Sequence, residues 1–301
     1  MFRRWVLAAC IAGVGACIAF FFLDIKPVSV LCSEGFALLA RKGGDATENA
    51  EAAYNKFDRA VSLAPSCAVC YFGRGVSLYR QFYFWAKTNI LDIEHPGLSE
   101  DIAQIMWDNL TKAIELDPNL AEAYFFRGLV TLNLLARSKS VDIDDFSAAL
   151  SLNDPQSTHW GLYTHEDIYY WRGMAWARRE GCLNEAIADF SSAISLDSTY
   201  VGAYFQRGLA YEALGGKELL AIKDFDAVIS LDPTSTTPYY HRAVLRAQLG
   251  QYDGAIADME RLVDSIDCAF TNALDRSYPD LNQDESLCKK GEELLAQWRA
   301  R

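Results

Sequence analysis

The chain has 301 residues, of which 51% are hydrophobic and 13% aromatic. This much apolar side-chain material can form a core and excludes an intrinsically disordered chain. The formal net charge is −12, and beyond residue 26 the chain holds 25 basic and 39 acidic residues, a net charge of −14. Because a body this acidic repels phosphate, we expect no nucleic acid among its partners.

The first segment, residues 1–26, has the pattern of a membrane anchor. After Arg3 and Arg4 come 19 residues without a charge, residues 5–23. As a helix they would span about 28 Å, close to the thickness of the bilayer core. We therefore predict one N-terminal transmembrane helix, a signal anchor with its two arginines in the cytoplasm. The body would then be extracytoplasmic, which means periplasmic if the organism is a bacterium.

Two other interpretations of this segment stay open. A secretory signal could be cleaved at the small residues near Ala16, although the apolar run continues past that point. Lipid attachment is the second alternative, because the sequences LAAC and VGAC, which end at Cys10 and Cys17, look like lipid-attachment boxes.

A short motif, Tyr-aromatic-x-Arg followed by Gly or Ala, recurs five times. Its copies begin at Tyr71, Tyr124, Tyr169, Tyr204 and Tyr239. Each copy is followed by a second amphipathic segment such as EAIADFSSAISLD, Glu185 to Asp197. In these segments a small residue, a large apolar residue four positions on and another apolar residue three further form one helical stripe. An Asp-Pro or similar pair then ends the helix.

This pattern resembles the tetratricopeptide repeat, a helix–turn–helix unit of about 34 residues. The resemblance implies an all-α fold, an α-solenoid of about six such units over residues 27–266. Its first unit, residues 29–65, is degenerate, and insertions at 80–100 and 154–167 interrupt the period. We expect residues 267–301 to form a C-terminal cap, with a helix after Leu281.

The motif residues have predicted structural roles. The glycine should let the two helices of a unit approach closely, with the tyrosine filling the groove beside it. Four of the five arginines have an aspartate 16 to 18 residues later, in the second helix of their own unit, and we expect each of these arginines to form an ion pair with that aspartate. The predicted pairs are Arg127–Asp145, Arg172–Asp189, Arg207–Asp224 and Arg242–Asp258, with the reversed pair Glu34–Lys56 in the first unit.

The residue after each tyrosine, and the residue four positions further on, lie on one face of the first helix. In tetratricopeptide proteins this face lines the concave groove, so the resemblance implies a partly aromatic groove that binds a peptide or helix. The alternative is that these side chains only fill the superhelix. The predicted groove residues are Phe72, Val76, Phe125, Leu129, Tyr170, Met174, Phe205, Leu209, Tyr240 and Val244.

Six cysteines lie beyond the anchor, an even number that fits an oxidising compartment. The disulfide candidates are Cys268 with Cys288, and Cys67 with Cys70, with Cys32 as a third party. The spacing Cys67-x-x-Cys70 also occurs in redox and zinc sites. No second such pair exists in the sequence, so we favour a disulfide, either local or between units, and predict no metal site and no cofactor.

These observations predict a protein without catalytic activity, a membrane-anchored scaffold that binds partner proteins through its concave groove. Acidic chaperone tails are disfavoured as ligands, since repeats that clamp such tails carry basic and amide residues on this face. The alternatives are a periplasmic lipoprotein-like or secreted adaptor that recruits an envelope enzyme, and a structural subunit of a membrane complex. The sequence does not indicate an oligomeric state.

Overall fold

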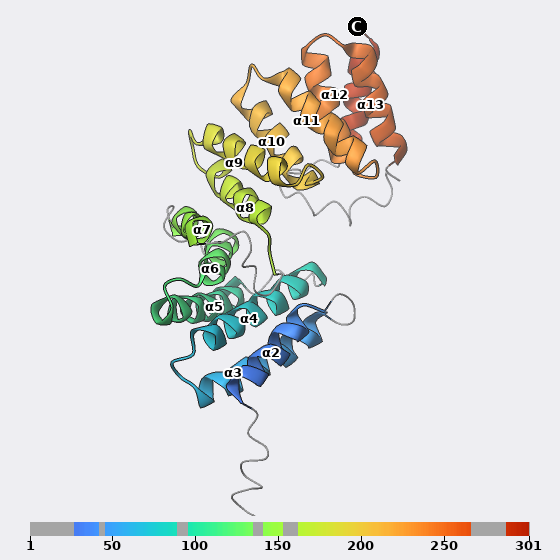
Figure 1. Cartoon of the computed structure of the whole chain (residues 1–301). Helices are drawn as coiled ribbons and strands as arrows, with labels where there is room; N and C mark the ends of the chain where they lie inside the picture. Colours follow the sequence, from blue (N-terminus) through green and yellow to red (C-terminus); the bar gives the residue numbers. More distant parts are fainter. Residues whose placement is uncertain are drawn as a thin grey trace, which may run out of the picture. The chain divides into compact units, whose positions relative to one another are not determined.

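The computed structural model describes residues 27–41, 46–88, 96–134, 141–152, 162–265 and 287–300 (Figure 1). Side chains are described in these ranges except at 83–88, 96–100, 264–265 and 287–289. The predicted anchor, the Cys268 position and the side chain of Cys288 lie outside the described residues. Packing divides the chain into two compact units, one up to Leu162 and one from Tyr163, a division that the sequence did not predict.

The first unit contains three hairpins of two helices each. Its helices are α2 (Val28–Leu39), α3 (Ala46–Leu63), α4 (Ala68–Thr88), α5 (Pro96–Leu116), α6 (Ala121–Asn133) and α7 (Val141–Leu152). Each helix packs against the next one along the chain, and the first helices of successive hairpins also touch. The insertion predicted at residues 80–100 lengthens the two helices of the second hairpin, α4 and α5.

The second unit repeats this arrangement and adds one helix. Its helices are α8 (His165–Ala177), α9 (Leu183–Leu196), α10 (Val201–Leu214), α11 (Glu218–Leu231), α12 (Thr237–Gln248), α13 (Tyr252–Ser265) and α14 (Leu287–Arg299). The last of these, α14, packs against α13. The described ranges contain helices and no strand, which confirms the predicted all-α class and the six helical hairpins.

An aromatic ring of the second helix faces the motif glycine of the first helix. A Cβ atom added at this glycine would lie 2.7–2.9 Å from the ring in three hairpins, which pair Gly128 with Phe146, Gly173 with Phe190 and Gly208 with Phe225. Real Cβ atoms do not approach this closely, so the glycine is required for contact between the helices. The predicted role of the glycine is confirmed, and the ring that faces it comes from the second helix.

The last hairpin has different residues at the positions of the glycine and of the aromatic ring. Ala243 replaces the glycine, and Met259 replaces the aromatic residue of the second helix. Both side chains are fully buried in one cluster. Methionine is unbranched and flexible, so it can leave room for the alanine methyl group.

Aspartates end several second helices. α5, α9 and α11 end at Leu116, Leu196 and Leu231, and the next residue in each case is an aspartate. Its Oδ1 accepts a hydrogen bond from the backbone N–H two residues later, at 3.0 Å for Asp117, 2.8 Å for Asp197 and 3.1 Å for Asp232. Such a bond competes with continuation of the helix, so the helix ends even where serine replaces proline after Asp197.

The C-terminal helix covers the end of the last hairpin. Leu295 and Trp298 of α14 are buried in the cluster that contains Met259 and Leu262 of α13. A Cβ at Gly291 would lie 3.1 Å from Met259 Sδ, so the two helices are in close contact. A polar outer face over such a cluster is the arrangement expected of a terminal cap.

Among the helices that the structure describes, none combines the length and the apolar character that a membrane crossing needs. Residues 5–23, where the anchor is predicted, are not among the described residues.

Candidate functional site

The arginines of the motif form the predicted ion pairs inside each hairpin. In four hairpins Nε and Nη2 donate to the two carboxylate oxygens of one aspartate, at 2.5–2.9 Å. The four pairs are those predicted, Arg127–Asp145, Arg172–Asp189, Arg207–Asp224 and Arg242–Asp258. The reversed pair of the first hairpin also forms, with Lys56 Nζ 2.8 Å from Glu34 Oε2. Buried pairs of this kind specify a geometry more than they add stability.

The same arginines make a second contact that the sequence analysis missed. Nη1 reaches a polar residue on the second helix of the preceding hairpin, always 16 positions earlier in the chain. The acceptors are Asp58 for Arg74 (2.9 Å), Thr111 for Arg127 (3.3 Å), Ser191 for Arg207 (3.0 Å) and Asp226 for Arg242 (2.5 Å). Each of these guanidinium groups therefore joins three helices from two hairpins. The constant spacing of 16 residues was the signal that could have revealed this contact.

Arg74 meets an amide where the other motif arginines meet an aspartate. Its Nε donates to Asn109 Oδ1 at 2.7 Å. The two residues are 35 positions apart because the insertion separates the two helices in sequence.

Burial raises the pKa of Asp145, the acid that stands at the position of Asn109 in the next hairpin, and the bonds from Arg127 oppose that shift.

The tyrosines of the motif stack under the arginines. The guanidinium carbon lies 5.2–5.7 Å from the ring centre of the tyrosine three residues earlier, in all five copies of the motif. This cation–π contact holds the arginine in the rotamer that reaches both neighbouring helices. The tyrosine and arginine of the motif are therefore structural.

In the first unit the predicted groove residues are buried. Phe72 and Val76 of α4 have no exposed surface, and Phe125 and Leu129 of α6 are 2% and 4% exposed. Phe126 covers part of this region, with its ring centre 5.8 Å from that of Phe72. These four side chains are core residues of the solenoid, as the alternative interpretation of the pattern had it.

In the second unit the predicted residues divide into two groups. Phe205 is buried against Phe225, and Tyr240 is buried under α14, where Lys290 Nζ lies 5.6 Å from its ring centre. The other four keep part of their surface exposed although they are large and apolar. These are Tyr170 and Met174 of α8, Leu209 of α10 and Val244 of α12, and we call them the α8–α12 face.

His241 of α12 makes specific contacts with α10 and α11. Its ring stacks on Phe225 with the ring centres 5.4 Å apart. Its Nδ1 lies 2.8 Å from an oxygen of Glu212, a partly exposed residue of the preceding hairpin. The α8–α12 face therefore carries a carboxylate next to its apolar residues.

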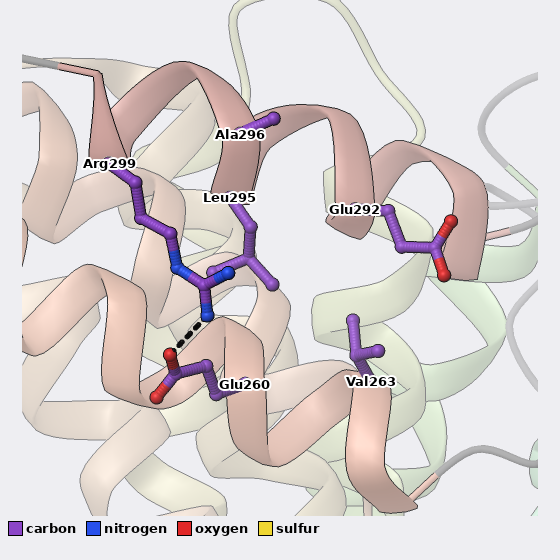
Figure 2. Close-up of a pocket in the computed structure, with 6 residues that line it drawn as sticks. All are labelled: Glu260, Val263, Glu292, Leu295, Ala296 and Arg299. Carbon is purple, nitrogen blue, oxygen red and sulfur yellow. Dashed lines mark hydrogen bonds and ion pairs between the residues drawn. The ribbon is translucent and has the colours of Figure 1, made fainter.

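A small cavity of about 280 Å³ lies between α13 and α14. Figure 2 shows Arg299 paired with Glu260 on one side of it and Glu292 on the other. The lining residues are Glu260, Val263, Glu292, Leu295, Ala296 and Arg299. Small-molecule sites usually measure about 300–1,000 Å³ and are mostly apolar, so we assign no ligand to this cavity.

Three cysteines meet at the start of α4. Cys67 and Cys70 form a disulfide, as predicted for this pair, and Cys32 Sγ of α2 lies 3.4 Å from Cys70 Sγ. All three Sγ atoms lie within 4.8 Å of one another. In the part of the chain that the structure describes, no other group of three potential metal ligands lies this close together. The predicted pairing of Cys268 with Cys288 remains a prediction.

Two segments of the chain match models of a known repeat family. A model of the TPR repeat matches residues 177–215, and a model of the tetratricopeptide repeat matches residues 237–265. These two segments are tetratricopeptide repeats. Comparison with curated proteins gave no match.

Solved tetratricopeptide structures have the same fold. The type IV pilus biogenesis factor PilW superposes with a TM-score of 0.58 at 15% identity, over 82% of this chain and 96% of PilW. YrrB, a TPR protein with an unusual peptide-binding site, gives 0.51 at 20% identity, over 69% of this chain and 91% of YrrB. MamA gives 0.49 at 20% identity, over 58% of this chain and 95% of MamA. The PilW and YrrB comparisons show a shared fold, and at these identities they do not show a shared function.

Proposed function

We propose that this chain is a non-catalytic scaffold that binds a partner protein on the α8–α12 face. The observation that carries this proposal is a difference between equivalent positions of the same chain. Phe72, Val76, Phe125 and Leu129 are buried, whereas Tyr170, Met174, Leu209 and Val244 stay partly exposed. Large apolar side chains that remain exposed on one face favour a binding surface.

The chemistry of this face defines the partner segment. Apolar side chains would pack on Tyr170, Met174 and Leu209, as in other complexes where a peptide helix lies in an apolar groove. Basic residues on the partner would meet the Glu212 carboxylate and the net charge of −14 beyond residue 26. We therefore propose an amphipathic segment with a basic flank. Acidic tails and nucleic acids would be repelled.

We further propose that residues 5–23 anchor the protein in a membrane, with the repeats on the extracytoplasmic side. The uncharged run of 19 residues after two arginines supports this orientation. Protease protection in intact cells or spheroplasts tests it. Digestion of the repeats from the cytoplasmic side would contradict the orientation, and release of the unmodified full-length chain by alkaline extraction would contradict the anchor.

The binding proposal is tested by cross-linking and co-purification from native membranes. The test variant is Tyr170→Ala/Met174→Ala/Leu209→Ala in the full-length chain. The matched control is Leu196→Ala/Leu219→Ala/Leu231→Ala, which removes leucines that are 40–67% exposed elsewhere in the same unit. Circular dichroism must show that both variants fold.

We expect the test variant to lose one specific partner that the control keeps. If both variants keep every partner of the wild type, the α8–α12 face is not the binding surface. If both lose the same partner, binding depends on general apolar exposure and the proposal also fails.

A further inference from the structure

The three cysteines at the start of α4 are arranged in a way that a single disulfide does not require. Cys67 and Cys70 belong to the second hairpin, and Cys32 comes from α2 of the first hairpin. Cys70 is fully buried and Cys32 is 8% exposed, whereas Cys67 is partly exposed. A disulfide uses two sulfurs, yet a third is held 3.4 Å from one of them.

The spacing of the sulfurs suits one shared ion. Metal–thiolate bonds are about 2.3 Å long, so thiolates around one ion lie about 3.8–4.0 Å apart. The three Sγ atoms already lie within 4.8 Å of one another. Small rotations of the side chains of Cys67 and Cys70, once the bond between them is broken, would bring all three onto one centre.

The same distances disfavour thiol–disulfide exchange as the purpose of Cys32. Displacement at Cys70 needs the attacking and leaving sulfurs on opposite sides of it. With a disulfide bond of about 2.05 Å, Cys32 and Cys67 would then be about 5.4 Å apart, but they lie within 4.8 Å. The sulfurs form a triangle instead of a line.

We propose that Cys32, Cys67 and Cys70 bind one thiophilic metal ion when the disulfide is reduced. Three thiolates suit Cu(I) in trigonal coordination, or Zn²⁺ with a fourth ligand on the exposed side of Cys67. Cys67 lies immediately before α4, and its Sγ accepts a hydrogen bond from the backbone N–H of Cys70 at 3.2 Å. The cluster would therefore hold either a disulfide and a free thiol or one metal ion. This revises the prediction of no metal site.

The switch between the two forms is a two-electron reduction. A water-soluble phosphine breaks the Cys67–Cys70 bond, takes the oxygen of one water molecule to become a phosphine oxide, and leaves the two protons of that water on the thiols. Metal binding then displaces the thiol protons to the solvent.

The test uses the full-length chain in detergent, reduced under anaerobic conditions and freed of phosphine. Cu(I) and Zn²⁺ are titrated separately against a chromogenic chelator. We expect one ion per chain bound by the reduced cluster, and loss of that ion in each of Cys32→Ser, Cys67→Ser and Cys70→Ser. Cys182→Ser is the matched control because this free cysteine lies outside the cluster, and Cys268→Ser/Cys288→Ser controls for the other predicted pair.

X-ray absorption of the loaded wild type gives an independent readout that does not depend on the folding of a variant. Three sulfur neighbours support the proposal with Cu(I), and three sulfurs with one lighter atom support it with Zn²⁺. The proposal is overturned if the reduced chain binds neither ion. It is also overturned if a folded Cys32→Ser variant binds as the wild type does, or if only two sulfurs surround the ion.

Discussion

Phe57 is enclosed by glycines on two sides, and this contact allows a sharp test of the packing. A Cβ at Gly73 would lie 2.2–2.4 Å from three atoms of the Phe57 ring, and a Cβ at Gly35 would lie 2.6 Å from two of them. The ring is fully buried and cannot move away from one glycine without meeting the helix that carries the other. We therefore predict that Gly73→Ala destabilises the first unit.

The magnitude follows from two opposing contributions. Alanine in place of glycine within a helix gains about 1 kcal/mol. Overpacking a buried site costs roughly 1–3 kcal/mol and sometimes more, and contacts near 2.2 Å belong at the high end of that range. The expected net loss is about 2 kcal/mol in the free energy of unfolding. This loss is expected although other hairpins carry Phe126, Trp171 or His241 at the position of Gly73.

A second change should rescue the first. Phe57→Met introduces the residue that the last hairpin has at the equivalent position, Met259, and its flexible side chain gives the methyl group at residue 73 room. Alone it should cost roughly 1–2 kcal/mol, and the double variant should be more stable than Gly73→Ala, with a coupling energy of about 1–3 kcal/mol. Gly202→Ala is the control, because its Cβ would meet the nearest ring atom at an ordinary 3.4 Å.

Urea unfolding followed by circular dichroism gives the stabilities, and hydrogen exchange of α2 to α4 places the change in the first unit. Two results would refute the reasoning. One is a Gly73→Ala variant at least as stable as the wild type. The other is additivity of the two substitutions within about 0.5 kcal/mol, which would show that the ring and the methyl group do not compete for space.

Three further predictions concern single contacts. Asp224→Ala should cost about 3–5 kcal/mol because it leaves Arg207 buried and unpaired, while Arg207→Leu/Asp224→Leu should cost much less; urea unfolding of both variants decides this. Trp298→Ala should cost about 3–5 kcal/mol of local stability at α14 and promote self-association. Hydrogen exchange measures the stability, and analytical ultracentrifugation measures the association. An unchanged exchange rate would contradict the role of the cap. Tyr200→Phe removes the hydroxyl that donates to Asp167 at 2.8 Å and should cost about 1–3 kcal/mol, and a melting temperature equal to that of the wild type would show that this bond contributes nothing.

The ion pairs of the arginines could be predicted from the sequence because they lie within one hairpin, where loops of similar length give spacings of 16 to 18 residues. Glu34 and Lys56 are 22 residues apart and occupy the same two motif positions with the charges reversed. The partner of Arg74 could not be found in this way, since an insertion moved Asn109 to 35 residues away.

Exposure on the concave face could not be predicted from periodicity. Phe72 and Tyr170 occupy equivalent motif positions, yet only Tyr170 keeps exposed surface. The difference depends on rings contributed by other helices, such as Phe126 against Phe72 and α14 over Tyr240. A variant such as Phe125→Ala or Phe205→Ala would therefore disturb folding and is a poor test of binding.

The ion pairs also bear on how a protein of this design can change in length. Each of five hairpins carries its own partly buried cation and its own counter-ion, whichever of its two helices supplies the cation. The bond that crosses to the preceding hairpin ends on serine, threonine or an aspartate that solvent can reach. Duplication or deletion of a whole hairpin of this kind therefore leaves no unmatched buried charge at the junction. A recombination point inside a hairpin could join the first helix, with Glu34, to a second helix that carries aspartate in place of Lys56. Two carboxylates would then lie together, and such a junction would be selected against.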